Sequence, residues 1–103
     1  MPKGTVASFF TYWIGPGWYD GGWNEIDVEL APSSGTSKVS TNLIYGMGSY
    51  HTESHVYEDC PPHNEWQTHR VDWTPDYIRW FVNDVQVREA LPNDKGVSTM
   101  TKD

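Results

Sequence analysis

A seven-residue stretch in which polar and apolar side chains alternate constrains the fold more than any other part of this 103-residue chain. It occupies residues 24–30 and has the sequence Asn-Glu-Ile-Asp-Val-Glu-Leu. Successive side chains on a β-strand point to opposite faces, so Glu25, Asp27 and Glu29 share one face and the apolar residues between them share the other. A helix would scatter the three acids around its axis. The stretch therefore predicts a half-buried strand with carboxylates along one side.

Strand signals dominate the rest of the chain as well, and no segment shows a convincing helical period. Asn83 and Asp84 tolerate positive φ and predict a tight hairpin turn. The polar segment 49–64 is expected to be a loop with a short strand around 55–57. The chain is predicted to be an antiparallel all-β sandwich forming a single domain. Besides the strand at 24–30, strands are expected at residues 5–13, 38–45, 66–73 and 77–82.

Composition excludes some functions and leaves others open. A net charge of −7 and a pI near 4.8 argue against binding to nucleic acid or to an anionic membrane surface. No apolar run approaches the roughly 18 residues that would span a bilayer, and no signal peptide is visible. A single cysteine, Cys60, cannot form an internal disulfide and is expected to be a free thiol in a loop. Six Trp and 15% aromatic residues suit core packing, and they also suit stacking on sugar rings.

The acidic strand has a spacing that suits one kind of catalysis. Residues i and i+4 on a strand lie about 13 Å apart at Cα. Two Glu side chains that lean toward each other could bring their carboxyl carbons to roughly 5–6 Å, which approaches the separation in a retaining glycosidase. Asp27 lies within reach of both neighbours, and mutual repulsion raises the pKa of one member of such a coupled triad.

Two other interpretations of the three acids stay open on spacing alone. They could form a solvated edge whose charges block edge-to-edge aggregation. They could also bind a hard cation such as Ca²⁺ through oxygen ligands. The aromatic surroundings favour catalysis. His51 and His55 are four residues apart, but a strand or loop would not hold them together as a helix would, so no metal site is predicted from them.

Four segments taken together resemble the family 16 glycoside hydrolases. They are GTVASFFTY at 4–12, WNEIDVEL at 23–30, KVSTN at 38–42 and VDWTPDYIRWFVNDVQVR at 71–88. Their order and the Glu-Ile-Asp-Val-Glu motif are most similar to those of bacterial lichenases, the endo-1,3-1,4-β-glucanases. The resemblance implies a curved jelly-roll sandwich, concanavalin-like, with a β-glucan polysaccharide lying across its concave face. It also implies a secreted enzyme.

The resemblance implies roles for seven residues. Glu25 corresponds to the nucleophile, Glu29 to the acid/base and Asp27 to an auxiliary carboxylate. Phe10, Tyr12, Trp23 and Asn42 correspond to residues that contact sugar, although a core role for Phe10 and a purely structural role for Asn42 stay open. No cofactor is expected, and the family's structural calcium site would lie outside this chain.

Some features depart from the family pattern. Gln67 stands where the family commonly has His, and His69 where it has Tyr, which puts the support these side chains give in doubt. Ile44 replaces a groove tyrosine, so the glucan linkage is not fixed. Sandwich enzymes of this type run to about 200–250 residues, and this chain resembles only the central portion of one, truncated at both ends.

Truncation leaves several outcomes open. The chain is expected to be part of a longer protein, or to be completed by self-association or by a partner that supplies the missing strands. Besides a retaining endo-β-glucanase, it could be a transglycosylase, a non-catalytic glycan-binding module or an inactive fragment.

Overall fold

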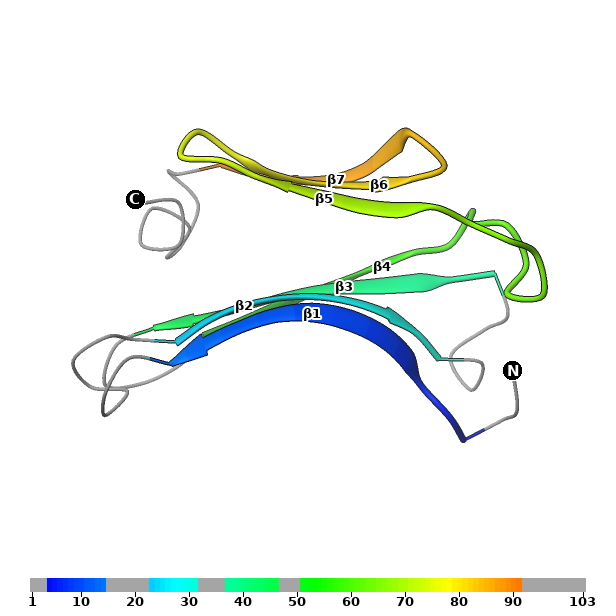
Figure 1. Ribbon diagram of the computed structural model, residues 1–103, viewed down its shortest axis with the longest axis horizontal. Coiled ribbons are helices and arrows are strands. Elements are labelled where there is room, and N and C mark those ends of the chain that lie inside the picture. The colour runs from blue at the N-terminus through cyan, green and yellow to red at the C-terminus, as the bar shows by residue number, and fades with distance from the viewer. Residues whose placement is uncertain (1–3, 15–22, 32–36, 47–50, 92–103) are drawn as a thin grey trace.

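Two antiparallel β-sheets, one long and curved and one short, make up the described part of the chain (Figure 1). The computed structural model describes residues 4–14, 23–31, 37–46 and 51–91. The curved sheet has the order β1-β2-β3-β4, with β1 Ala7–Ile14, β2 Trp23–Leu30, β3 Val39–Gly46 and β4 His51–Tyr57. The short sheet has the order β5-β6-β7, with β5 His69–Trp73, β6 Ile78–Val82 and β7 Val85–Ala90. The all-β antiparallel sandwich predicted from the sequence is therefore confirmed.

The core lies between the two sheets because one face of each is apolar. Burial alternates along β3 and β6, as expected for strands with one face packed and one face open. The apolar side chains of β2 and β3 form one buried cluster with those of β6 and β7, comprising Ile26, Val28, Val39, Leu43, Tyr45, Ile78, Trp80, Val82 and Ala90. Figure 1 shows that the curved sheet is concave on the side facing away from the short sheet. The acidic face of β2 is opposite its packed face and therefore belongs to the concave side.

A buried arginine links the two sheets directly. Arg88 on β7 is only 9% exposed, and its Nη1 donates hydrogen bonds to the main-chain oxygen of Thr41 at 3.1 Å and to Thr41 Oγ1 at 3.0 Å. Its guanidinium also lies over the ring of Trp80, 4.4 Å from the centroid. Hydrogen bonds to a charged donor are stronger than neutral ones, so this contact fixes how β7 sits over β3.

The tight turn predicted at Asn83 and Asp84 is confirmed. Both residues have positive φ, 47° and 65°, and they join β6 to β7. Short polar side chains tolerate this backbone region better than bulky ones. Asn83 Oδ1 also accepts a hydrogen bond from the Thr68 amide at 2.8 Å, which ties the turn to the segment before β5.

Two boundaries differ from those expected. The prediction of a loop with only a short strand near 55–57 was wrong, because β4 begins at His51 and pairs with β3 along its length. Pairing with an apolar neighbour overrides the polar composition of this segment. The strand expected from residue 66 begins at His69 instead. The side chain of Gln67 explains this difference, because it donates to the carbonyls of Pro61 and Pro62, at 3.0 Å each, and so holds the preceding residues in a loop.

Two further expectations concern single features. Cys60 lies outside the strands, as expected, but its side chain is buried with the core and burial raises the pKa of its thiol. Within the described ranges, the chain has no helix of the length and apolarity needed to cross a bilayer.

We expect Arg88→Met to lower the free energy of unfolding by about 1–3 kcal/mol, because it leaves the buried Thr41 acceptors without their donor. Chemical denaturation measured by tryptophan fluorescence checks this. The matched control is Arg79→Met, which removes an arginine on the outer face of β6 whose partner is Glu89 at 2.7 Å. Exposed ion pairs contribute little, so the control should shift the midpoint much less. Equal losses in the two variants would contradict the assignment of Arg88 as the link between the sheets.

Candidate active site

The three acids of β2 lie on one face of the curved sheet. The strand is extended from Trp23 to Leu30 and pairs with both neighbours, without a register shift. Alternate residues of such a strand point the same way, so Glu25, Asp27 and Glu29 project together onto the concave side. The expectation of an extended acidic strand with a common face is confirmed. The chemical roles of the three residues stay predictions.

The pairing register arranges the surroundings of the acids in rows that run across the strands. Each row contains one acid, with one residue of β1 on one side of it and one residue of β3 and one of β4 on the other. The rows are Tyr12–Glu25–Ile44–Thr52, Phe10–Asp27–Asn42–Ser54 and Ser8–Glu29–Ser40–Val56. Aromatic rings therefore lie on the β1 side of the acids, and hydroxyl groups lie mostly on the β4 side.

Asp27 is the buried member of the triad. It is 4% exposed, whereas Glu25 and Glu29 are half-buried. Burial is the largest cause that raises the pKa of Asp27, to about 7, followed by a side-chain hydrogen bond with Glu25 and by the charges of Glu25 and Glu29. Near neutral pH its carboxyl group therefore holds a proton for much of the time and can donate it in a hydrogen bond to the Glu25 carboxylate.

Phe10 and Tyr12 are exposed on the acidic face rather than packed in the core. They are 58% and 57% exposed and lie directly across from Asp27 and Glu25. Flat apolar faces with this placement can stack on a sugar ring. The core role left open for Phe10 is thus not what the structure shows, and contact with sugar stays a prediction for both residues.

Asn42 and Trp23 complete the set expected from the sequence. Asn42 lies across from Asp27, and its Oδ1 is buried without a hydrogen-bond partner among the described residues. A buried acceptor without a donor is costly, so this oxygen is suited to accept a hydrogen bond from a ligand hydroxyl. Trp23 begins β2, across from Gly46. The structure describes its backbone but not its side chain.

The β4 part of this face was missed by the sequence analysis. Thr52 and Ser54 extend two of the rows beyond β3. They were not predicted because segment 49–64 was expected to be mainly loop. Its lack of Gly and Pro between residues 49 and 60 was the available signal of a strand.

Gln67 and His69, which depart from the family pattern, lie away from the acids. The Gln67 amide holds the Pro61 and Pro62 carbonyls, and its Oε1 contacts His69 Nε2 at 3.0 Å. Burial lowers the pKa of His69, with a smaller contribution from His63. These side chains therefore support the loop before β5 rather than the carboxylates.

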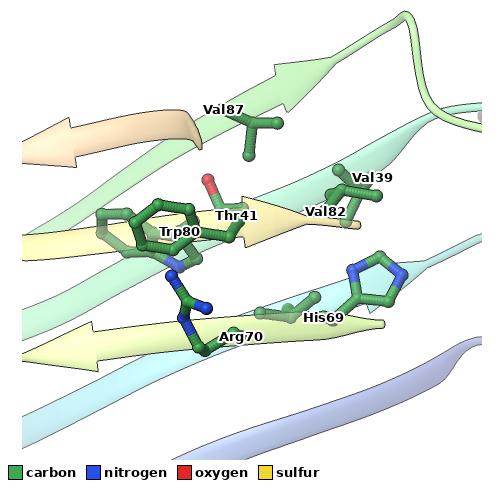
Figure 2. Close-up of a pocket in the computed structure, with 9 residues that line it drawn as sticks. Val39, Thr41, His69, Arg70, Trp80, Val82 and Val87 are labelled. Atoms are coloured by element: carbon green, nitrogen blue, oxygen red, sulfur yellow. The ribbon is translucent and has the colours of Figure 1, made fainter. Parts of the chain in front are cut away.

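A crevice on the other side of the curved sheet is part of the core and not of this site (Figure 2). Trp80 and Val82 of β6 line it together with Val39 and Thr41 of β3, and His69 and Arg70 of β5 lie on one side. Apolar side chains dominate its lining. In the described ranges, no three His, Cys, Asp or Glu side chains, the acids of β2 included, are grouped so as to hold a metal ion. The structure describes the backbone of His51 but not its side chain.

Comparison with known proteins decides the family. The family model for glycosyl hydrolases family 16 matches residues 2–101. This chain belongs to glycosyl hydrolases family 16. A beta-glucanase of Bacillus subtilis (strain 168) is 38% identical over 91 residues, covering 87% of this chain and 35% of the relative. A beta-glucanase of Fibrobacter succinogenes (strain ATCC 19169 / S85) is 33% identical over 91 residues, covering 85% of this chain and 26% of the relative.

A solved structure has the same fold over nearly the whole chain. The structure titled Apo Crh5 transglycosylase superimposes with a TM-score of 0.67 at 25% identity, covering 98% of this chain and 39% of that one. The chain thus spans about a third of the length of the relatives and neighbour it matches. Family membership supports the jelly-roll class of sandwich, as the resemblance predicted.

We expect Asp27→Asn to flatten the pH dependence of stability. Because the folded-state pKa of about 7 lies above the ordinary value of 3.8, the folded protein binds more protons than the unfolded chain between these pH values. The contribution of Asp27 to the free energy of unfolding is therefore fully present below pH 3.8 and is lost as pH rises through about 7.

Melting temperatures measured between about pH 4 and pH 8 check this. The melting temperature of the wild type should fall across this range, and that of Asp27→Asn should fall less. Asp72→Asn is the control, because Asp72 lies on the outer face of β5 beside Arg70 and not among the acids. A wild-type slope in Asp27→Asn would contradict the raised pKa.

Proposed function

We propose that this chain is the central part of a family 16 catalytic domain that cleaves β-glucans with retention of anomeric configuration. The observation that carries the proposal is the arrangement of Glu25, Asp27 and Glu29 on one concave face, with Asp27 buried and hydrogen-bonded to Glu25. Membership of a family that includes beta-glucanases supports the same conclusion. Residues 1–103 would supply the catalytic strand and part of the cleft.

In the first step, Glu25 attacks the anomeric carbon C1 of the bound glucan. A C1–O bond to Glu25 forms while the bond from C1 to the leaving sugar oxygen breaks, and the proton that this oxygen needs comes from Glu29. The product is a glycosyl-enzyme ester together with a free sugar chain end. The four-residue spacing on one strand supports a pair of carboxyl groups that act on the same bond from one side of the sheet. The resemblance to the family assigns the attack to Glu25 and the proton transfer to Glu29.

In the second step, water attacks C1 and breaks the ester. Glu29, now ionised, takes the proton from the water, and Glu25 leaves as a carboxylate. Two inversions at C1 give net retention. Asp27 would keep its proton throughout and donate a hydrogen bond to Glu25. This bond limits the repulsion between Asp27 and Glu25 whenever Glu25 is a carboxylate.

The rows across the strands support a polysaccharide substrate. Phe10 and Tyr12, and Trp23 at the start of β2, would stack on sugar rings, and Asn42 Oδ1 would accept a hydrogen bond from a sugar hydroxyl. The relatives named beta-glucanase support a β-glucan substrate, and the resemblance of the sequence to lichenases favours a β-1,3-1,4- or β-1,3-glucan. Such polymers are too large to enter a cell, which favours action outside it.

We expect the protein to release reducing ends from mixed-linkage β-glucan or laminarin, and Glu25→Gln to lower the rate by at least about 1,000-fold because it removes the nucleophile. Xyloglucan serves as a third substrate. Glu65→Gln, a matched change on the loop before β5, should keep the wild-type rate. Unchanged turnover in Glu25→Gln would contradict the assignment.

Azide distinguishes the two glutamates. In Glu25→Ala, azide can replace the missing nucleophile and should give an α-glycosyl azide, the product of one inversion. In Glu29→Ala, assayed with an aryl β-glucoside whose leaving group needs no proton, azide should intercept the glycosyl-enzyme and give a β-glycosyl azide. NMR of the products reads the anomer. The opposite pattern would exchange the two roles.

Transglycosylation is a second candidate, favoured by the similarity to the structure titled as a transglycosylase. A sugar hydroxyl would then replace water in the second step, with Glu29 again taking the proton. We expect an excess of laminari-oligosaccharide acceptor to divert the glycosyl-enzyme into longer products, which mass spectrometry detects. If only hydrolysis products form at high acceptor concentration, this candidate is wrong.

A non-catalytic glycan-binding module is the remaining alternative. It needs the aromatic rings and hydrogen-bonding groups but neither glutamate as a nucleophile or acid. In that case the wild-type chain would show no turnover, and calorimetry would show that it binds glucan with an affinity that Glu25→Gln leaves unchanged. An inactive fragment would show neither turnover nor binding.

A further inference from the structure

The loop of residues 58–68 joins β4 of the curved sheet to β5 of the short sheet, and it is bound to the segment that enters β3. The Cys60 amide donates a hydrogen bond to the Ser37 carbonyl at 3.1 Å. One residue further along that segment, the Lys38 carbonyl lies 2.8 Å from His63 Nε2. These bonds hold the loop against the curved sheet at the end where the two sheets are connected.

The hydrogen bonds of His63 and His69 show which nitrogen of each ring carries the proton. A carbonyl oxygen only accepts, so His63 Nε2 donates to the Lys38 carbonyl. The Gln67 amide nitrogen donates to two main-chain carbonyls of the loop, so its Oε1 is the acceptor for His69 Nε2, 3.0 Å away. In both neutral rings, Nδ1 therefore carries a lone pair and no proton.

Both Nδ1 atoms are buried and have no hydrogen-bond partner among the described residues. A proton added there would create a buried N–H group without an acceptor, together with a positive charge away from water. Burial lowers the pKa of His69, and the charge of His63 lowers it further. The two rings are therefore close enough for a proton on one to oppose a proton on the other.

The surroundings of His69 offer no negative charge that would stabilise the protonated ring. Two hollows border this ring, and their lining comes from β1, β2, β3, β5, β6 and β7. Besides His69, Arg70 is the only ionisable residue in that lining. Arg70 is itself a cation, and it pairs with Asp72 and Asp84 at 3.1 Å each.

The charged groups near His63 are likewise engaged elsewhere or exposed. The Lys38 ammonium group pairs with Glu58 at 3.2 Å. The other ionisable side chains of the loop and of the end of β4 are Tyr57, Asp59, Cys60 and Glu65. In the described part of the chain, none of these forms an ion pair with either histidine.

We propose that His63 and His69 form a pH-sensitive latch, which keeps the loop 58–68 closed while both rings are neutral and releases it in mild acid. In the closed loop, a proton on either Nδ1 lacks an acceptor, and protons on both rings repel one another. In the open loop, water solvates the charged rings. The open state therefore binds more protons than the closed state.

The direction of the pH dependence follows from this difference in bound protons. The contribution of His69 to closure is fully present above its ordinary pKa of 6.5 and is lost as pH falls below that value. Asp27 has the opposite effect on stability, because its contribution is lost as pH rises. A measurement on the loop itself separates the two, since Asp27 lies on the concave face.

The Cys60 thiol reports whether the loop is open. It is 6% exposed in the closed loop, so it should react with dithiodipyridine, a reagent that modifies thiols in acid as well as at neutral pH, only on opening. The labelling rate is divided by that of the urea-unfolded chain at the same pH. We expect this ratio to rise by about tenfold or more between about pH 7 and pH 5, because each proton taken up on opening changes the equilibrium by up to about tenfold per unit of pH.

The double variant His63→Gln, His69→Gln tests whether the histidines cause this rise. Its glutamine amides can still donate hydrogen bonds but do not titrate, so the ratio should stay nearly constant. His55→Gln is the matched control, since His55 is exposed on β4, and it should keep the wild-type rise. Far-UV circular dichroism shows that the variants are folded. A constant ratio in the wild type, or the same rise in the double variant, would overturn the proposal.

Nitrogen NMR of the wild-type histidine rings is a test that needs no variant. At about pH 8, the chemical shifts of His63 and His69 should show the proton on Nε2 in both rings. His55 gives the reference for a ring in water. A proton on Nδ1 of either ring would overturn the proposal, because the buried lone pair on which the latch depends would not exist.

Discussion

The alternation of side chains along β2 sets both the packing of the sandwich and the position of its acids. One parity supplies Ile26 and Val28 to the core, and the other supplies the three acids to the concave face. A shift of one residue would bury carboxylates between the sheets and expose the apolar residues. The same physical requirement that makes the sandwich fold therefore also aligns the groups of the candidate site, so stability and chemistry are set by one register.

Electrostatic repulsion among the acids is the cost of this arrangement. Asp27 is nearly fully buried between neighbours of like charge, which raises its pKa to about 7. Holding a proton removes one of three charges from a small area and supplies a hydrogen bond to Glu25. The face is thus poised with a neutral acid at its centre and two half-buried glutamates beside it, which fits the two distinct carboxyl roles of a retaining mechanism.

Packing is uneven across the sandwich. Arg88 and Trp80 of the short sheet lie over β3, where the main-chain oxygen and hydroxyl of Thr41 accept hydrogen bonds from the arginine. Towards β1 the short sheet ends, and Phe9 and Trp13 are left exposed. The part of the curved sheet that carries the aromatic rings of the acidic face is therefore also the part with the least support behind it.

Local stereochemistry made three features predictable from the residues alone: the strands with strong alternation, the turn at Asn83 and Asp84, and the common face of the acids. It did not determine β4, whose polar residues form a strand only because β3 lies beside them. Nor did it place Phe10, since alternation states that a side chain shares a face but not whether another layer covers that face. Tertiary structure decided these points, because burial and strand pairing depend on which segments meet in space.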